Sequence, residues 1–169
     1  MNVFNIVKFY QKCIESRIKP IIGCQIPLEE FVNSDFNPYI TLLCQNYNGY
    51  KNMIKILSNA HVSADNSHPS TKLEILSKYN DNLIILSGGR EGILGKNLLY
   101  EDLFKVKSHI SSLKNIFYDR FYIEIQRILS SDEEKYRSLC INLSEEFELP
   151  IVATNAVRFI DEDDFKTHE

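Results

Sequence analysis

The sequence predicts an α/β fold built on a mainly parallel sheet. Residues 18–25 and 150–159 each contain a short apolar, β-branched run that ends abruptly in small or polar residues, as buried strands of parallel sheets do. Between these runs, the spacing of apolar residues switches repeatedly between the helical and the extended period. Strands that alternate with helices through short loops indicate crossover units, arranged either as a doubly wound sheet or as a closed barrel.

A helix and two strands are predicted at the start of the chain. Apolar residues from Val3 to Ile14 recur every three or four positions, which is typical of an amphipathic helix. Pro20 cannot continue a helix, so the chain is expected to be extended from there through Ile26. Residues 39–44 form a further apolar run and predict the next strand.

Two helices and a strand follow. Asn48 is expected to cap a helix with an apolar inner face. That face consists of Tyr50, Met53, Ile54 and Leu57. After a polar loop at residues 64–70, Thr71 to Glu74 has the spacing of a capping box and predicts a short helix. The run from Leu83 to Leu86 predicts a strand that ends in Ser87-Gly88-Gly89.

The last third of the chain repeats the alternation. A helix through residues 103–113 leads to a strand from Phe121 to Ile125. A second capping box, Ser131 to Glu134, opens a helix that ends near Phe147. The final strand is predicted from Pro150 to Thr154.

The chain is expected to be a single domain, residues 1–169, truncated at both ends. Its length suits one domain, but five predicted strands fall short of the roughly eight that a closed α/β barrel usually needs. Because the chain starts in a predicted helix, we expect that the strand which this helix should follow is missing. Residues 161–165 are typical of the acidic first turn of a helix, which Glu169 cuts short.

The composition argues against nucleic-acid binding and against a membrane span, and it indicates the cellular compartment. A formal net charge of -4, with Lys and Arg scattered along the chain, predicts no basic face, so direct nucleic-acid binding is not expected. No run approaches the roughly 20 apolar residues of a membrane span. The four cysteines are far apart in apolar segments, so we expect reduced core thiols and a cytoplasmic protein. These cysteines are Cys13, Cys24, Cys44 and Cys140.

Several residues are candidates for a site, but each has a structural interpretation that we favour. Residues 87–92 could cradle a phosphate, but they lack the established glycine spacings, so a tight turn is preferred. Glu124 and Glu145 could form an acid/base pair, yet both are expected to be structural, with Glu124 pointing outward from its strand. The aromatic pairs 117–118 and 121–122 are expected to pack in a core or a protein interface. The dispersed histidines are expected at the surface, namely His61, His68, His109 and His168.

Five segments together resemble the polymerase-and-histidinol-phosphatase (PHP) domain at the amino terminus of the bacterial DNA polymerase III alpha subunit. They read KFYQKCIESRIKPIIGC, NGYKNMIKILS, LIILSGGREG, DRFYIEI and LPIVATNAVRFIDEDDFKTHE, and they occur in order and with similar spacing. The resemblance covers essentially the whole chain. It implies a distorted barrel of seven βα units, of which this chain supplies roughly the later five.

The resemblance also implies that the metal site of the family has decayed. Metal-binding members place a glutamate, a histidine and a cysteine where this chain has Gln25, Tyr39 and Gly89. They follow Thr154-Asn155 with Asp-x-His, where this chain has Ala156-Val157-Arg158, and their remaining ligands would precede Met1. Neutral oxygens and one guanidinium do not hold the two or three cations that such a phosphoesterase needs. We therefore assign no catalytic, cofactor-binding or metal-binding residue, and we expect Arg158 to fill the site, hydrogen-bonded to Asn155 or Gln25.

Two functions of different class remain. The resemblance implies a catalytically silent scaffold within the polymerase alpha subunit, which supports the polymerase and docks the proofreading exonuclease subunit without a cofactor. The alternative is a surviving metal-dependent phosphoesterase. Polymerisation is not expected from these residues, because the palm-domain aspartates of such enzymes would lie far downstream.

Overall fold

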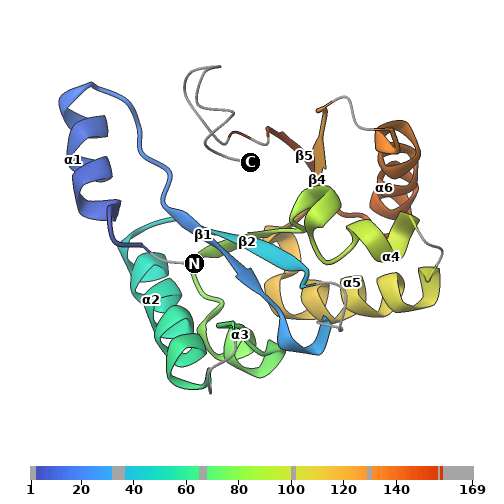
Figure 1. Ribbon diagram of the computed structural model, residues 1–169, viewed down its shortest axis with the longest axis horizontal. Coiled ribbons are helices and arrows are strands. Elements are labelled where there is room, and N and C mark those ends of the chain that lie inside the picture. Colours follow the sequence, from blue (N-terminus) through green and yellow to red (C-terminus); the bar gives the residue numbers. More distant parts are fainter. Residues whose placement is uncertain are drawn as a thin grey trace.

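The computed structural model describes residues 3–31, 37–64, 68–99, 102–128, 131–155 and 157. Helices and strands alternate within them (Figure 1). The helices are α1 (Ile6–Glu15), α2 (Tyr47–Val62), α3 (Leu73–Tyr79), α4 (Gly95–Leu99), α5 (Leu103–Phe117) and α6 (Glu133–Phe147). The strands are β1 (Gly23–Pro27), β2 (Tyr39–Cys44), β3 (Leu83–Leu86), β4 (Phe121–Gln126) and β5 (Ile151–Thr154). Three short 3-10 helices, η1 (Glu29–Phe31), η2 (Gly89–Glu91) and η3 (Tyr118–Arg120), complete the order.

The five strands form one sheet in the order β1-β2-β3-β4-β5. β3, β4 and β5 are parallel neighbours, but β2 runs antiparallel to both β1 and β3. The α/β class is confirmed, whereas the prediction of a mainly parallel sheet is not, because the sheet is mixed. The reason lies in the connections: the described residues between β1 and β2 contain no α-helix that crosses over, and α2 and α3 together return the chain to the end of the sheet that it left.

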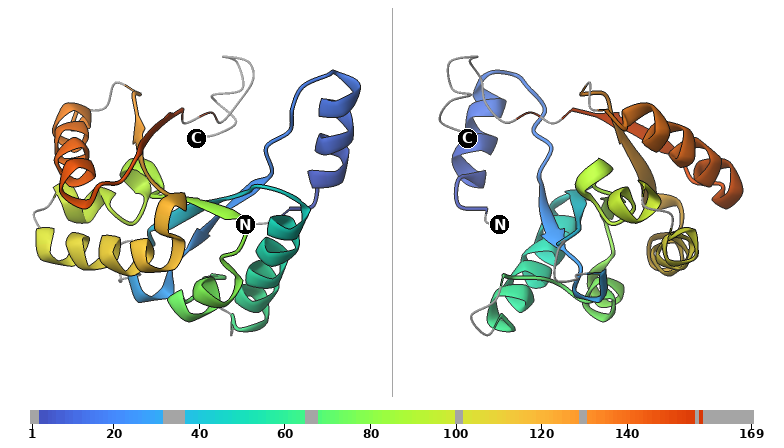
Figure 2. Two further views of the ribbon diagram at one scale, coloured as in Figure 1. Left: turned by 180° about the vertical axis from the view of Figure 1, so that it is seen from behind. Right: turned by 45° about the vertical axis from the view of Figure 1, so that its right-hand side comes forward.

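β1 and β5 lie at the two edges of the sheet, so the described strands do not close into a barrel. The barrel that the resemblance implies therefore stays a prediction. Figure 2 shows the sheet as an open, twisted layer with helices gathered on one side.

One face of the sheet carries the hydrophobic core. α2 contacts β1, β2 and β3, while α5 and α6 contact β4. Side chains on this face alternate with those on the other face along each strand, as extended backbone requires. The fully buried members of the core face include Ile26, Ile40, Leu42, Leu83, Ile85, Phe121 and Ile123. The opposite face is less covered, and its members Gln25, Thr41, Leu43, Ile84 and Tyr122 are exposed or half-buried.

The first helix is the exception to this packing. The predicted amphipathic helix is confirmed as α1, but none of its residues is buried. In all three views it stands apart from the helices that cover the sheet (Figures 1 and 2). Val7, Tyr10 and Ile14, on its apolar side, are 62%, 50% and 53% exposed. The described part of the chain thus leaves this apolar stripe uncovered.

Helix starts differ from the predictions in detail. The side chain of Asn46, rather than Asn48, caps α2 and accepts hydrogen bonds from two backbone N–H groups. The capping box at Thr71 does not form, because Thr71 pairs with Leu28 in an isolated parallel bridge. Glu30 instead accepts the hydrogen bond from the Leu73 N–H at 2.9 Å. The box expected at Ser131 is also absent, since α6 starts after Asp132 without a side-chain cap.

None of the described helices has the length and apolar character that a membrane span requires.

Candidate functional site

The parallel strands β3, β4 and β5 bring their carboxyl ends to one rim of the sheet. Ser87 follows β3, Gln126 ends β4, and Thr154 ends β5. The antiparallel β2 contributes its first residue, Tyr39, which forms an isolated bridge with Gly92. Open α/β sheets place their ligand sites at such a rim, so the side chains here are the candidates for function.

Glu124 lies at the centre of a buried polar network on this rim. Its side chain is 5% exposed, and it accepts hydrogen bonds from the Gly88 N–H at 3.0 Å and from the Thr154 hydroxyl. The Gln126 amide donates to Thr154 Oγ1 at 3.2 Å and contacts Glu124 Oε1 at 3.4 Å. Glu124 lies on the face opposite the core, as its predicted outward alternation requires, but it is buried there and not exposed.

The backbone around Glu124 is held by the same network. Its N–H donates to Ser87 Oγ at 2.9 Å, and its carbonyl accepts a hydrogen bond from the Tyr136 hydroxyl at 3.2 Å. Burial raises the pKa of Tyr136 well above its usual value, so this phenol remains a donor at any physiological pH. The carboxylate and its backbone thus link β3, β4, β5 and α6.

The turn after β3 is shaped to this carboxylate. Gly88 and Gly89 adopt φ angles of 84° and 62°, a region that favours glycine. A Cβ atom at Gly89 would lie 3.0 Å from the Gln126 side chain, so that amide lies against the glycine. Since the Gly88 N–H already binds Glu124, this turn holds an internal carboxylate where a phosphate cradle would hold a ligand. The predicted tight turn is confirmed.

The residues at the family's implied ligand positions do not form a metal cage. Gln25 and Asn155 are exposed, Tyr39 is half-buried, and Gly89 offers no side chain. Ala156 and Arg158 lie outside the described residues. The expectation that the Arg158 guanidinium fills the former metal site therefore stays a prediction. Across the part of the chain that the structure describes, no three His, Cys, Asp or Glu side chains are grouped to hold a metal ion. An amide, a phenol and a glycine do not fit the cations of the phosphoesterase family.

The histidines divide into two kinds. His61 and His68 are exposed as predicted, and His168 lies outside the described residues. His109 is buried, so the prediction of a surface imidazole is wrong for it. Its ring stacks on Phe31 with centroids 3.6 Å apart. Burial, aided by Lys105, lowers its pKa to about 4, so the imidazole is neutral at pH 7.

The remaining candidates are structural. Glu145 is exposed on α6, as expected, while Phe117 and Phe121 are fully buried in the core. All four cysteines are free thiols, as predicted. Cys140 is in the core and Cys24 and Cys44 pack against it, whereas Cys13 on α1 does not, so the prediction of a core position is wrong for Cys13. Burial raises the pKa of Cys24 and Cys140 to about 12 and that of Cys44 to about 11, so these three are protonated and weakly nucleophilic at neutral pH.

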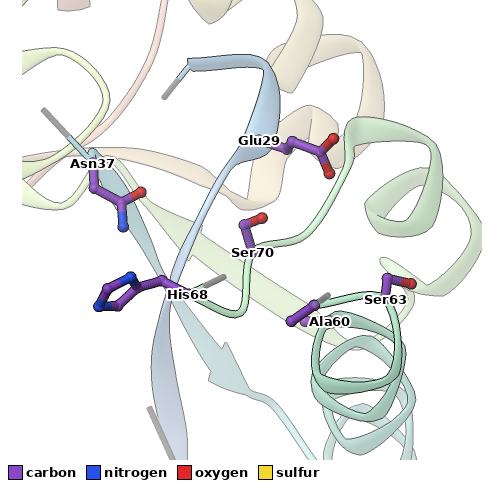
Figure 3. Close-up of a pocket in the computed structure, with 7 residues that line it drawn as sticks. Glu29, Asn37, Ala60, Ser63, His68 and Ser70 are labelled. Atoms are coloured by element: carbon purple, nitrogen blue, oxygen red, sulfur yellow. The ribbon is translucent and has the colours of Figure 1, made fainter. Parts of the chain in front are cut away.

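A cavity of about 530 Å³ lies away from the rim, between the end of α2 and the segment before β2 (Figure 3). Ser63, His68, Ser70, Asn37 and Glu29 line it, together with Ala60 and Ala64. The described side chains that line it include one carboxylate and one imidazole, which by themselves are neither the charge nor the ligand set of a metal or phosphate site.

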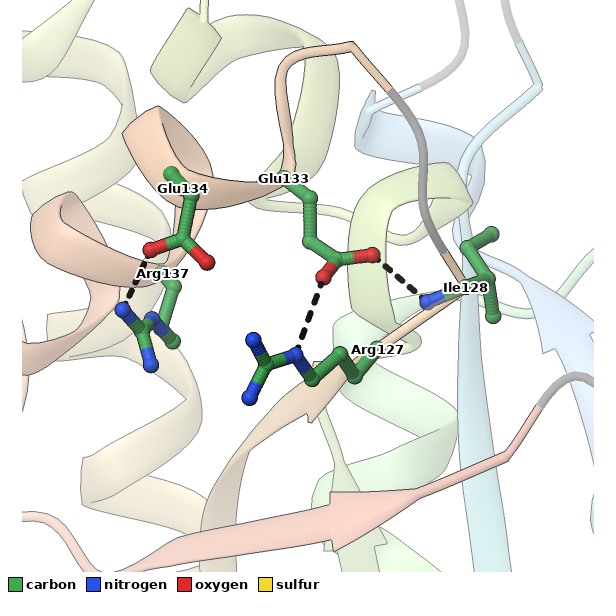
Figure 4. Close-up of polar contacts among 5 residues, drawn as sticks. All are labelled: Arg127, Ile128, Glu133, Glu134 and Arg137. Carbon is green, nitrogen blue, oxygen red and sulfur yellow. Dashed lines mark hydrogen bonds and ion pairs between the residues drawn. The ribbon is translucent and has the colours of Figure 1, made fainter.

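A second polar cluster joins β4 to the start of α6 (Figure 4). Glu133, only 8% exposed, accepts a hydrogen bond from the Ile128 N–H at 2.5 Å and lies 3.8 Å from Arg127 Nε. Glu134 pairs with Arg137 one turn along the helix. Both carboxylates stand in the first turn of α6, where the helix dipole stabilises negative charge. Glu133 ties Arg127 and Ile128, which follow β4, to the start of α6, whereas the pair of Glu134 and Arg137 lies within the helix.

Comparison with known proteins agrees with this architecture. The PHP domain family matches residues 1–128 of the chain. This chain belongs to the PHP domain family. It is 36% identical to the DNA polymerase III subunit alpha of Haemophilus influenzae over 168 residues, which is 99% of this chain and 14% of that protein. It is also 36% identical to the subunits of Vibrio cholerae and Escherichia coli K12, in each case over 169 residues and 15% of the relative. The PHP chain therefore spans about one seventh of the length of these relatives.

Sequence reasoning named Glu124 but missed its burial and its partners Gln126 and Thr154. Glu124 and Gln126 occupy alternate positions of β4 on the side away from the core, and Thr154 pairs with Gln126 in register. Polar residues at alternate positions close to a strand's carboxyl end are the signal that could have identified this network. The turn at Gly88 and the neighbouring β5, which bury it, are tertiary features.

Proposed function

We propose that this chain is a catalytically silent PHP segment of a DNA polymerase III alpha subunit, a cytoplasmic protein of DNA replication. In this role it supports the polymerase and docks the proofreading exonuclease subunit. The relatives support the first part, because they are DNA polymerase III alpha subunits that align with 99% of this chain. The exonuclease partner rests on the resemblance of the five sequence segments to that domain.

One observation supports the proposal that the site has no catalytic activity: the polar groups of the rim bind one another. The Glu124 carboxylate is bound by the Gly88 N–H and the Thr154 hydroxyl, and the Gln126 amide lies against Gly89. A phosphoesterase needs carboxylates and imidazoles that are free to hold cations and to activate water. Gln25 and Tyr39 supply only neutral oxygens. A rim of this composition suits a scaffold better than a hydrolase.

Measurements of bound metal and of hydrolysis test directly whether the chain lacks metal-dependent catalytic activity. The purified chain is dialysed against zinc or manganese, and bound metal is measured by mass spectrometry alongside hydrolysis of p-nitrophenyl phosphate. We expect well under one ion per chain and no hydrolysis that depends on the metal. The opposite result would be one bound ion per chain and metal-dependent hydrolysis that Gln25→Ala abolishes. It would favour the phosphoesterase hypothesis over the scaffold hypothesis.

Exonuclease docking is tested separately. The chain is immobilised and titrated with the proofreading exonuclease subunit of the Haemophilus influenzae polymerase, with serum albumin as the control protein. Saturable binding is the expected result. Absence of binding, with the chain shown to be folded by circular dichroism, would remove docking from the proposal and leave the silence of the site unaffected.

A further inference from the structure

We propose that Cys24, Cys44 and Met53 form a binding site for one copper(I) ion at the margin of the hydrophobic core. We call these three residues the sulfur site. Two thiolates and one thioether are soft ligands, a combination that selects Cu(I) over hard cations such as Mg²⁺ and Ca²⁺. Cys24 lies on the same face of β1 as the buried Ile26, whereas Gln25, at the family's implied ligand position, lies on the other face. The sulfur site is therefore separate from the implied metal site of the family.

Two of the three sulfur atoms are already in contact. Cys44 Sγ, at the end of β2, lies 3.6 Å from Met53 Sδ of α2. Two ligands that bind one ion at roughly 2.3 Å, with an angle of about 105° to 120° between them, are separated by about 3.6 to 4.0 Å. Met53 is fully buried, and close packing holds its side chain in this position. The spacing of this pair therefore already suits a shared ion.

The third sulfur atom comes from the neighbouring strand. Cys24 pairs with Leu42 in the antiparallel ladder, and Cys44 lies two residues further along β2, so the two cysteines are diagonal neighbours on one face. Diagonal neighbours have Cα atoms about 7 to 8 Å apart. A disulfide needs a shorter Cα separation of roughly 4.4 to 6.8 Å, whereas an ion between the two sulfur atoms adds the missing length. The register of β1 and β2 thus favours a bridging ion over a disulfide.

The electrostatic interaction of the two thiols supports this placement. Burial is the main cause that raises the pKa of Cys24 to about 12, and the negative charge of Cys44 contributes to the same rise. Ionisable groups shift one another's pKa in this way when they lie close together. A cation bound between the two sulfur atoms would replace their mutual repulsion by attraction to the ion.

The surroundings of the sulfur site allow an ion to enter and favour a soft one. Cys24 and Cys44 are half-buried, and β1 lies at the edge of the described sheet, so the site is within reach of solvent. Within the described ranges, no His, Asp or Glu joins the two cysteines to complete a set of three such ligands. Three sulfur ligands leave Zn²⁺ one short of its usual four, so Cu(I) is the better match.

Binding exchanges two protons for the ion. Both thiols release their proton to solvent, two Cu–S bonds form, and the Met53 thioether donates a lone pair to the metal. No electron is transferred, because the copper stays Cu(I) and neither sulfur is oxidised.

The test uses the purified chain under anaerobic, reducing conditions, with Cu(I) supplied as its coloured complex with ferrozine. We expect the chain to withdraw one ion from this complex and to gain the ultraviolet charge-transfer absorption of Cu(I)–thiolate bonds. X-ray absorption should show only sulfur neighbours, at roughly 2.3 Å from the copper. No transfer of copper, or nitrogen and oxygen neighbours around it, would overturn the proposal.

Variants test the location of the ion. Cys24→Ser and Cys44→Ser each remove one thiolate and should weaken Cu(I) binding by at least about tenfold. Met53→Leu removes the thioether, keeps nearly the same side-chain volume, and should weaken binding by about tenfold. Cys13→Ser makes the same change on α1, outside the core, and should leave the Kd within about twofold. Circular dichroism checks that each variant is folded.

Two results would show that the copper is bound elsewhere and would overturn the sulfur site. One is a Kd that Cys24→Ser and Cys44→Ser leave unchanged, and the other is an equal loss of affinity in Cys13→Ser. The outcome is separable from the test of the proposed function. Metal bound by the sulfur site would be lost in Cys44→Ser and kept in Gln25→Ala, whereas metal at the implied phosphoesterase site would show the opposite pattern.

Discussion

The carboxylate of Glu124 on β4 binds the backbone N–H of Gly88 in the turn after β3, with 3.0 Å between Oε2 and the nitrogen. This contact joins two parallel strands at the rim where α/β proteins carry their sites.

Removal of the Glu124 carboxylate is the first prediction. Glu124→Ala would leave the Gly88 N–H and the Thr154 hydroxyl without their buried acceptor, at a cost of about 2 kcal/mol in the free energy of unfolding. Urea denaturation followed by circular dichroism measures the change. Glu145→Ala, at an exposed position, is the control and should stay within about 0.5 kcal/mol of the parent. Equal stabilities of the two variants would contradict the structural role of Glu124.

The glycine turn gives a second prediction. Gly89→Ala should lower the free energy of unfolding by about 1 to 2 kcal/mol, because Gly89 has a φ of 62° and its new Cβ would contact Gln126. Gln126→Ala relieves the contact but not the backbone strain. A double-mutant cycle in urea should therefore show a coupling energy of at least about 0.5 kcal/mol. Strict additivity would place Gln126 away from Gly89.

The buried imidazole makes stability depend on pH. The folded-state pKa of His109 is about 4, below the ordinary value of 6.5, so the unfolded chain binds the proton first as pH falls. His109 therefore favours folding above pH 6.5, and its contribution is lost as pH falls from 6.5 towards 4, by at most about 1.4 kcal/mol per pH unit. Urea unfolding at pH 7 and pH 5 measures the difference.

Two variants test whether His109 is the group that makes stability depend on pH. His109→Gln should lose less stability than the parent between pH 7 and pH 5, because the titrating group is gone. His61→Gln, at an exposed position, should keep the dependence of the parent. A parent-like pH dependence in His109→Gln would show that other groups are responsible.

Alkylation tests the predicted low reactivity of the three cysteines whose pKa is raised. At pH 8, iodoacetamide should modify Cys24, Cys44 and Cys140 slowly in the native chain, since burial raises their pKa values and keeps them protonated. In denaturing urea all four cysteines should react, as mass spectrometry of tryptic peptides would show. Rapid native modification of Cys140 would mean that α6 opens readily.

The sequence predicted the elements well because their signals are local. Apolar spacing identified α1, α2 and α5, the capping-box spacing at Ser131 indicated α6, and short apolar runs identified the five strands. The direction of β2 was not predictable from such signals. It depends on the connections on either side of the strand, and the spacing of apolar residues within β2 predicts neither of them. The described residues between β1 and β2 contain no α-helix, and both α2 and α3 lie between β2 and β3.

The candidate site was predicted less well, for a related reason. Alternation placed Glu124 correctly on the face opposite the core, but the turn at Gly88 and the strand β5 bury that end of the face. His109 lies three residues after Val106 and four before Leu113, on the apolar side of α5, and this spacing was the available signal. A polar residue that occupies a position on the apolar face of a helix can thus be buried, although its residue type alone predicts exposure.

The reversed direction of β2 also affects how this rim can vary. Because β2 enters the sheet at the rim, the connection between β1 and β2 reaches the same side as the turn at Ser87 to Gly92. Insertions or deletions in that connection would remodel the surface next to Glu124 without altering any strand pairing. Lineages could thus diversify what this side of the protein contacts by changing loop length alone, while the helices behind the sheet stay as they are.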